Sequence, residues 1–407
     1  MNQKLFTFIE VVVLGGLVVF VMYIGGAFKA PDAVPTPQPA PTQLAPTATL
    51  NITPVPSVTP APPALTQPIG LIAFDSFRDG NPEIYVVDVE TGIQTNLTNN
   101  PESDGLIAWS PDGSRLAFTS DRSGEPEIYV MNADGAEVIQ LTHTQDTQDT
   151  KTGYYPFVSW SPDGRQIVIV RHEARPGQRY VLSSLDLIRS DGSGVKTLYS
   201  STEFYILQAS WSPDGKYIAV TGSDSSSSAL RVHVGEVGEA PFGLNYFQGN
   251  PCDKYIWSPD SKITCFGDRE SVTMNPDGSE AKTRPTGLSG DGFVEGVAWS
   301  PDGQHLLFLA TMFIPQSDQN PTRRLFAINA NGSENLKIID VRESETAFNI
   351  IPSWSPDGQW IAYSLVKGDL ADIYIVNIYE PSQYRQLTSD TSYNFSPQWQ
   401  PRPKQMP

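Results

Sequence analysis

Cysteine is almost absent from this 407-residue sequence, which contains only Cys252 and Cys265. Two cysteines are too few for a disulfide framework, and they lack the paired C-x-x-C spacing of a zinc site. Their thirteen-residue separation predicts that they lie on neighbouring strands of one hairpin. A single local disulfide between them is therefore possible, provided that this part of the chain lies outside the cytoplasm.

Histidine is also scarce, and the four histidines do not have metal-ligand spacing. They are His143, His172, His233 and His305. His172 and the neighbouring Arg171, expected in one loop, come closest to a functional cluster. Three acidic residues of the expected loops lack the D-x-D-x-D-G pattern of a calcium loop. They are Asp146, Asp149 and Asp291. We expect no metal site and no cofactor.

Basic residues are few compared with acidic ones, 27 against 45, and the formal net charge is -18. Nucleic-acid binding depends on lysine and arginine side chains that displace the counterions of the phosphate backbone. The charge has the wrong sign for that function. We therefore expect no nucleic-acid partner.

One long apolar run, Leu5 to Phe28, stands near the start of the chain between Lys4 and Lys29. At about 1.5 Å per residue, a helix of this length crosses the roughly 30 Å of hydrocarbon in a bilayer. The alternative is a cleaved secretory signal, but Gly25-Gly26-Ala27 is a poor cleavage site. Residues 1–29 are predicted to form an uncleaved membrane anchor, with the rest of the chain outside the cytoplasm, in a periplasm or at the cell surface.

Glu10 interrupts this apolar run, and a charge within a membrane helix is costly. The segment Phe6-Thr7-Phe8-Ile9-Glu10-Val11 resembles the start of a mature type IV pilin, where a glutamate pairs with a neighbouring subunit's terminal amine. Leu5 stands where the prepilin peptidase normally cuts after glycine. A pilin-like filament or envelope-complex subunit stays an alternative to a helix in which Glu10 reaches the interface.

Residues 30–68 consist mainly of proline, threonine, alanine and valine, with almost no charge. Such a segment has too little apolar volume for a core and favours extended polyproline II geometry. At about 3.1 Å per residue it would span roughly 100 Å. The composition predicts a disordered stalk.

A repeat dominates the remainder of the chain: a strand that ends in Trp-Ser-Pro-Asp-Gly, a second strand, a loop, a strand similar to Ile-Tyr-Val, an Asp-Gly turn, and a last strand near Leu-Thr. The repeated tryptophans are Trp109, Trp160, Trp211, Trp257, Trp299, Trp354 and Trp399. From first to last they span 290 residues in six intervals, about 48 each, a spacing typical of four-stranded propeller blades. The sequence predicts an all-β propeller.

The residues of the Trp-Ser-Pro-Asp-Gly motif explain why it recurs. Proline and aspartate favour the corner of a type I turn, and glycine accepts the left-handed conformation, so the motif closes a tight hairpin. The tryptophan is predicted to be buried between adjacent blades, because its large apolar area joins one sheet to the next. Asp-Gly pairs such as Asp134-Gly135 are predicted to turn between the third and fourth strands.

The two ends of the repeat region complement each other. Residues 71–97 provide three strands before the first tryptophan, whereas Trp399 begins a blade that has no room to finish. One blade shared by both ends would close the ring and leave no open sheet edge. We predict a seven-bladed propeller over residues 69–400, with six blades as the alternative, and a short tail over 401–407.

The stretch from Phe118 to Gly135, which reads FTSDRSGEPEIYVMNADG, resembles the WD40-like PD40 repeats of the TolB family. The resemblance covers about residues 69–400 and implies a propeller with a role in protein binding. The α/β domain that precedes the propeller in TolB has no counterpart here. The family's specific partner is therefore not carried over.

Similar propellers also accompany enzymes, which provides the alternative of a hydrolase or lyase acting on peptides or polysaccharides. Peptidases of the prolyl oligopeptidase type need a Gly-x-Ser-x-Gly nucleophile elbow, and Gly287-Leu288-Ser289-Gly290-Asp291 departs from that pattern at its last position. Oligogalacturonate lyases need clustered metal ligands, which the scattered histidines do not provide. We expect no catalytic residues and a non-enzymatic protein.

In a four-stranded blade, the loops after the second and fourth strands lie on the face opposite the tight turns. These loops are longer and more varied, and variable loops on a rigid scaffold are the usual place for binding. Aromatic residues precede successive inner strands and are predicted to contact a protein or glycan partner at the cell envelope, unless they only pack under the loops. They are Tyr154, Tyr155, Phe204, Tyr205, Phe293, Phe348, Tyr393 and Phe395.

Overall fold

The structure, a computed structural model, divides the chain into two units, Met1–Leu65 and Thr66–Pro407, which are described separately. It describes the backbone of fourteen segments. They are residues 8–14, 17–23, 67–143, 151–174, 181–224, 230–239, 242–246, 254–266, 270–285, 292–312, 322–330, 335–341, 352–367 and 370–402.

The predicted membrane helix over residues 5–28 is not what the structure shows for the first unit. Its described residues form two antiparallel strands, β1 (Phe8–Leu14) and β2 (Leu17–Tyr23), with Leu14 opposite Leu17. Both strands are rich in valine, which favours extended structure, and a Gly-Gly pair separates them in the sequence, as in short hairpins. Within the described residues, no helix has the length and apolar character needed to span a bilayer. Nearly all of the predicted stalk lies outside the described residues.

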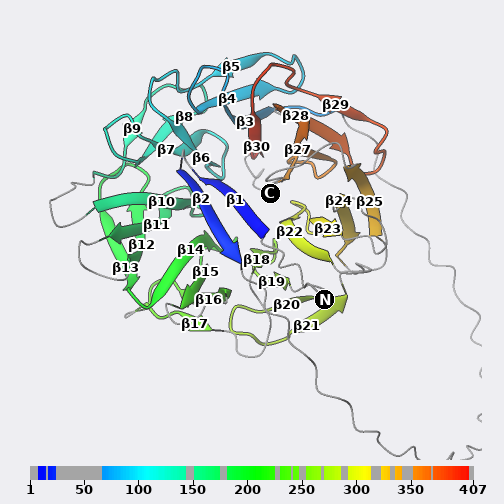
Figure 1. Ribbon diagram of the computed structural model, residues 1–407. Helices are drawn as coiled ribbons and strands as arrows, with labels where there is room; N and C mark the ends of the chain where they lie inside the picture. The colour runs from blue at the N-terminus through cyan, green and yellow to red at the C-terminus, as the bar shows by residue number, and fades with distance from the viewer. Residues whose placement is uncertain are drawn as a thin grey trace, which may run out of the picture. The chain divides into compact units, whose positions relative to one another are not determined.

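The second unit contains seven four-stranded antiparallel sheets, and Figure 1 shows them following one another around a ring. We number these blades from the first tryptophan of the repeat. Blade 1 consists of β6 (Asp104–Trp109), β7 (Arg115–Ser120), β8 (Glu127–Asn132) and β9 (Ile139–Gln140). Blade 2 consists of β10 (Lys151–Trp160), β11 (Gln166–Ala174), β12 (Leu182–Arg189) and β13 (Val195–Ser201). Blade 3 consists of β14 (Phe204–Trp211), β15 (Tyr217–Asp224), β16 (Leu230–Glu236) and β17 (Asn245–Tyr246).

The remaining blades have the same strand order. Blade 4 consists of β18 (Lys254–Trp257), β19 (Ile263–Phe266), β20 (Glu270–Met274) and β21 (Lys282–Pro285). Blade 5 consists of β22 (Gly292–Trp299), β23 (His305–Met312), β24 (Thr322–Asn329) and β25 (Asn335–Val341). Blade 6 consists of β26 (Ser353–Trp354), β27 (Trp360–Lys367), β28 (Leu370–Asn377) and β29 (Tyr384–Gln386).

Blade 7 is the predicted shared blade. Its inner strand is β30 (Asn394–Trp399), and its other strands are β3 (Leu71–Ser76), β4 (Glu83–Asp88) and β5 (Gln94–Asn96). In the β30–β3 pair, Trp399 lies opposite Ile72 and Phe395 lies opposite Asp75. The prediction of seven blades closed by strands from both ends of the propeller is confirmed, and the six-bladed alternative is wrong.

The Ser-Pro-Asp-Gly turns have the predicted geometry. In blade 1, the Ser110 hydroxyl donates to Asp112 at 2.6 Å and accepts from the Arg115 amide at 2.9 Å. Gly113 donates its amide to the Ser110 carbonyl and has a φ of 70°. Blade 4 differs, because Ser261 occupies the glycine position with a φ of 60°. Its hydroxyl accepts a 3.0 Å hydrogen bond from the amide of Asp214 in blade 3.

The repeated tryptophans join neighbouring blades, as predicted. The Nε1 of Trp160 donates to the carbonyl of Ala108, the residue before the tryptophan of blade 1, at 2.9 Å. Three other tryptophans repeat this bond with the preceding blade: Trp109 with Gln398, Trp257 with Ser210, and Trp354 with Ala298. The Nε1 atoms of Trp211 and Trp299 are buried without a hydrogen-bond partner.

In three blades, a Leu-Thr pair directly after the fourth strand is hydrogen-bonded to the third strand. In blade 1, the Thr142 hydroxyl accepts from the Ile128 amide at 2.8 Å and donates to the buried carboxylate of Glu127. Blades 7 and 6 repeat the arrangement: the hydroxyl of Thr98 donates to Glu83, and the hydroxyl of Thr388 donates to Asp372. The buried carboxylates of Glu83 and Glu127 and the half-buried carboxylate of Asp372 therefore have structural hydrogen bonds.

Cys265 lies in β19 and is disulfide-bonded. Cys252, the only other cysteine of the sequence, lies outside the described residues.

Candidate partner-binding face

Each blade is an antiparallel sheet in chain order, so the connections after its second and fourth strands lie at the same end of the sheet. We call this end of the ring the long-loop face; the tight Ser-Pro-Asp-Gly turns lie at the other end. Of the aromatic residues predicted to bind a partner, those in the described residues lie at this end of the inner strands or directly before it.

Five of those aromatic residues share one position in the repeat, six residues before the blade tryptophan. They are Tyr154, Tyr205, Phe293, Phe348 and Tyr393. Tyr205 and Tyr393 are the two whose side chains lie within the described part of the chain, and they are 36 % and 42 % exposed. The backbones of Tyr154 and Phe293 lie in β10 and β22, whereas Phe348 is outside the described residues.

The other three predicted residues differ. Phe204 is buried in the core beside Phe157 and Ile206, and its ring lies edge-on to His233 with centroids 4.5 Å apart, so it is not available to a partner. Phe395 is half-buried and stacks on Phe77 with centroids 5.7 Å apart. The side chain of Tyr155 is outside the described part of the structure.

Tyr393 and Phe395 belong to an apolar surface at the junction of blades 6 and 7. This blade 6/7 patch consists of Phe77, Leu370, Tyr393 and Phe395. Leu370 is 37 % exposed and precedes Ala371, which forms a β-bridge with Tyr393. Phe77 donates its amide to the carbonyl of Tyr393 at 3.1 Å. The patch therefore combines the inner strand and a loop of blade 7 with the first residue of β28 in blade 6.

Arg78 holds one side of the blade 6/7 patch in place. Its guanidinium forms a 2.8 Å ion pair with Asp390, donates to the Asn394 side chain at 3.0 Å, and lies 4.2 Å from the ring centroid of Tyr85. Arg122 makes the corresponding contacts in blade 1, with Asp104 and Tyr129. Repetition in two blades indicates that this arginine fixes the loop rather than serving a ligand.

Tyr205 lies at the junction of blades 2 and 3, beside His172. Its hydroxyl is 3.0 Å from His172 Nδ1, and the two rings stack with centroids 4.1 Å apart. His172 Nε2 is 2.8 Å from the carbonyl of Ile206. Burial lowers the pKa of His172 to about 4 and raises the pKa of Tyr205. The histidine is thus neutral at physiological pH.

His172 and Arg171 were expected in one loop, but both lie in β11. Adjacent residues of a strand point to opposite faces. Accordingly, Arg171 forms ion pairs with Asp186 at 2.7 Å and Glu173 at 3.1 Å, whereas His172 contacts blade 3. They do not form one cluster.

The remaining histidines are far apart in the fold: His143 is exposed after β9, His233 lies in β16, and His305 lies in β23. Across the described residues, no three histidine, cysteine, aspartate or glutamate side chains are grouped so that they could hold a metal ion. Three acidic residues considered for calcium lie outside the described residues. They are Asp146, Asp149 and Asp291.

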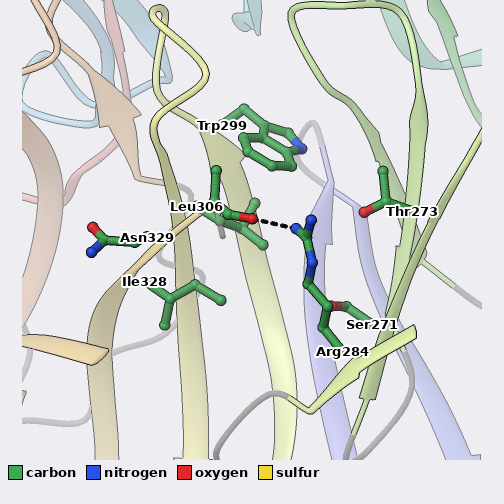
Figure 2. Close-up of a pocket in the computed structure, with 8 residues that line it drawn as sticks. Ser271, Thr273, Arg284, Trp299, Leu306, Ile328 and Asn329 are labelled. Atoms are coloured by element: carbon green, nitrogen blue, oxygen red, sulfur yellow. Dashed lines mark hydrogen bonds between the residues drawn. The ribbon is translucent and has the colours of Figure 1, made fainter. Parts of the chain in front are cut away.

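A narrow cleft separates blades 4 and 5 (Figure 2). Its volume of about 10 Å³ is what a single water molecule needs, too little for a substrate. Figure 2 shows Arg284 between Thr273 on one side and Leu306 on the other, and its guanidinium donates to the carbonyl of Ala330. This cleft belongs to the packing between blades.

Comparison with known proteins agrees with this architecture. Residues 51–186 match the TolB beta propeller domain, and residues 192–227 match the WD domain, G-beta repeat. An uncharacterized protein of Agrobacterium fabrum is 30 % identical over 146 residues, which is 35 % of this chain. The aligned region spans only about half of that relative, 47 % of its length.

Solved structures share the fold at low identity. TolB from Acinetobacter baumannii has a TM-score of 0.50 at 15 % identity, covering 82 % of this chain and 67 % of its own. An oligogalacturonate lyase from Vibrio parahaemolyticus has a TM-score of 0.53 at 14 % identity, covering 80 % and 87 %. A puromycin hydrolase has a TM-score of 0.58 at 13 % identity, covering 81 % and 55 %.

At these identities the likeness concerns the fold alone, since enzymes and TolB share the same ring. The repeats, the shared closing blade and the matched segments together identify the fold. The chain is a TolB-like β-propeller with PD40 and WD40 repeats.

Proposed function

We propose that this protein is a non-enzymatic scaffold that binds a protein partner at the cell envelope through the long-loop face of its propeller. The observation that carries the proposal is the exposure of Tyr205 and Tyr393 at the same position of the repeat. Four of the seven blade tryptophans form the same inter-blade bond, which marks them as part of the framework. Tyr205 and Tyr393 instead leave part of each ring exposed at the loop end of the inner strand, where a partner can reach it.

Both tyrosines are held by their surroundings. Tyr393 is fixed through its backbone by Phe77 and Ala371, and Tyr205 is fixed through its ring by His172. Large aromatic side chains that are already ordered lose little entropy on binding, and such residues supply most of the energy in protein interfaces. This favours recognition over turnover.

The proposed location is outside the cytoplasm, on a membrane tether. The apolar run over residues 5–28 and the proline-rich residues 30–68 would provide an anchor and a stalk. The disulfide at Cys265 supports this location, since disulfides persist in oxidising compartments.

The test is capture of the partner by the full-length protein in its native membrane, using chemical crosslinking and mass spectrometry. We expect the double variant Leu370→Ala, Tyr393→Ala to lose the captured protein. The matched control is Tyr384→Ala, which removes a tyrosine that is 66 % exposed on the outer strand β29. Capture that is equal in all three proteins, with unchanged melting temperatures, would contradict the proposal.

A propeller enzyme is the second candidate, since a lyase and a hydrolase are among the proteins with this fold. It predicts turnover by the purified full-length chain of peptides or polysaccharides, detectable by mass spectrometry of the products. Turnover that survives in the Leu370→Ala, Tyr393→Ala variant would favour this candidate over the scaffold.

A further inference from the structure

We propose that Tyr205, held by His172, is a binding site for a cationic side chain, arginine or lysine, of a basic segment in the partner. This inference rests on the proposed function, because it names the chemistry of one contact on the long-loop face. The site lies where the inner strand β14 of blade 3 meets β11 of blade 2.

Hydrogen bonds determine the direction of the Tyr205 hydroxyl. A backbone carbonyl only accepts, so the 2.8 Å contact with Ile206 places the His172 proton on Nε2. The Nδ1 of the neutral ring then carries a lone pair, and Tyr205 donates its O–H to that atom at 3.0 Å. The phenol oxygen therefore presents lone pairs, and no proton, to a ligand.

The ring of Tyr205 is held as firmly as its hydroxyl. It stacks on His172 with an interplanar angle of 27°. The next residue, Ile206, is bonded through both of its backbone groups, since its amide also donates to the Ser183 hydroxyl at 2.9 Å. On the paired strand β15, Gly222 has no side chain; a Cβ atom at this position would lie only 2.4 Å from the carbonyl oxygen of Tyr205. The exposed ring is thus stacked on His172 and is carried by a backbone that is bonded to blade 2 through Ile206.

The charges around Tyr205 favour a cation. At the strand ends next to Tyr205, Glu203 immediately precedes Phe204, Asp224 lies opposite Phe204 in the β14–β15 pair, and Glu173 follows His172. The guanidiniums closest to these carboxylates in the sequence are those of Arg171 and Arg231. Both guanidiniums already pair with carboxylates, Arg171 with Glu173 and Asp186, and Arg231 with Asp224. Glu203 is exposed only two residues from Tyr205.

A cation would satisfy all of these features together. An ammonium or guanidinium group is attracted by the face of a tyrosine ring, donates hydrogen bonds to a phenol oxygen, and is drawn by neighbouring carboxylates. An acidic ligand would be repelled by the same carboxylates and by the overall charge of -18. The charge distribution therefore selects a basic partner segment over an acidic one.

The test is calorimetric titration of the full-length protein with three blocked pentapeptides at low ionic strength. The peptides are acetyl-Gly-Arg-Gly-Arg-Gly-amide and its counterparts with citrulline or glutamate at both arginine positions. Citrulline keeps the shape of arginine, but a carbonyl oxygen replaces one guanidinium nitrogen, which removes the charge and two of the N–H donors. We expect the arginine peptide to bind about tenfold more tightly than the citrulline peptide, and the glutamate peptide to show no binding. Maltotriose is titrated in the same way to test for binding of a glycan.

Variants of Tyr205 and His172 separate the contribution of the Tyr205 ring to binding from that of its hydroxyl. Tyr205→Ala should weaken binding of the arginine peptide about tenfold or more, and Tyr205→Phe, which keeps the ring, about threefold. His172→Phe retains a stacking partner and removes the acceptor, so it should match Tyr205→Phe while leaving overall folding intact by circular dichroism. Tyr384→Ala should bind like the wild type.

Equal affinities for the arginine and citrulline peptides would overturn the inference, as would full binding by Tyr205→Ala, no binding by the wild type, or preferential binding of maltotriose. Any of these results would leave the proposed function standing if the Leu370→Ala, Tyr393→Ala variant still loses the native partner. Failure of both experiments would remove the proposed function as well.

Discussion

The indole Nε1 of Trp160 donates a 2.9 Å hydrogen bond to the carbonyl of Ala108, which immediately precedes the tryptophan of the neighbouring blade. The bond satisfies a carbonyl on the inner strand that has no further strand to pair with. It also places the indole between two sheets, where its apolar area is buried. Each such tryptophan therefore fixes the distance between two blades.

The hydrogen bond of Trp160 should be measurable by comparison with Trp211. Both are buried to a similar extent, 6 % and 8 % exposed, but Trp211 Nε1 has no partner. Trp160→Phe should lower the free energy of unfolding by about 1–2 kcal/mol more than Trp211→Phe, because it also leaves the Ala108 carbonyl unpaired. Denaturant unfolding of the two variants measures the difference, and equal losses would show that the indole bond adds nothing beyond packing.

Ser261 provides a second comparison, since it holds a left-handed backbone where the other described turns of this kind have glycine. Ser261→Gly relieves the backbone but loses the hydrogen bond from the Asp214 amide, and the two effects should nearly cancel. Ser261→Ala loses the bond and keeps the strain. We expect Ser261→Ala to be less stable than Ser261→Gly by about 1 kcal/mol in urea unfolding. The reverse order would mean that the turn relaxes when the hydroxyl is removed.

The propeller was predictable because short sequence motifs specify its turns and mark its strands. Pro111 and Gly113 specify a turn within four residues, and Trp109 marks the strand that precedes it. The shared blade followed from counting strands at the two ends. The helix predicted over residues 5–28 is not shown in the first unit, whose described residues form two strands. An apolar run rich in valine fits the length of a membrane helix and the composition of two strands equally.

The structure of the candidate binding face was predictable only in part. Sequence identifies Phe204 and Tyr205 as adjacent aromatics, but adjacent residues of a strand point in opposite directions, and only the register of β14 shows that Phe204 is buried. The contact between His172 and Tyr205 joins residues 33 positions apart in different blades. Leu370 begins β28 of blade 6 and Phe77 follows β3 of blade 7, and no spacing rule predicts that these two residues lie in one patch.

Closure of the ring should depend on Trp399 in β30. Its ring is buried in the core between blades 6 and 7, its Nε1 donates to Ile69 at 3.1 Å, and its amide donates to the Ser353 hydroxyl at 2.9 Å. Trp399→Ala should therefore lower the free energy of unfolding by about 3–5 kcal/mol. Deleting β30 and everything after it should abolish the cooperative melt, because β3 would become an open edge.

The control for Trp399 is Ile93→Ala, which truncates a residue that is well exposed in the same blade. Its melting temperature should equal that of the wild type. The melt of the β30 deletion is followed by circular dichroism. If this variant unfolds cooperatively at the wild-type melting temperature, blade 7 does not need the strand from the other end of the chain.

Asp75 should make the stability of the propeller depend on pH. Its side chain is buried at the blade 7/1 junction and its Oδ1 has no hydrogen-bond partner; burial raises its pKa to about 8. The pKa of an unfolded aspartate is about 3.9. Between these values the folded chain holds a proton that the unfolded chain has released, so stability falls as pH rises, by about 1.4 kcal/mol per pH unit for one such group.

Asp75→Asn removes this titration while keeping the shape of the side chain. At pH 7, about three units above the unfolded pKa, the variant should be more stable than the wild type by about 4 kcal/mol. The gain should fall below about 1 kcal/mol at pH 4, where the carboxyl is protonated in the folded state and about half protonated in the unfolded chain. Urea unfolding at pH 4, 5.5 and 7 measures the difference. Burial also raises the pKa of Asp104, Asp121 and Asp372, so the pH dependence of the wild type alone is not diagnostic. A gain that stays constant across the three pH values would mean that Asp75 does not change its protonation on folding and that its replacement acts through packing.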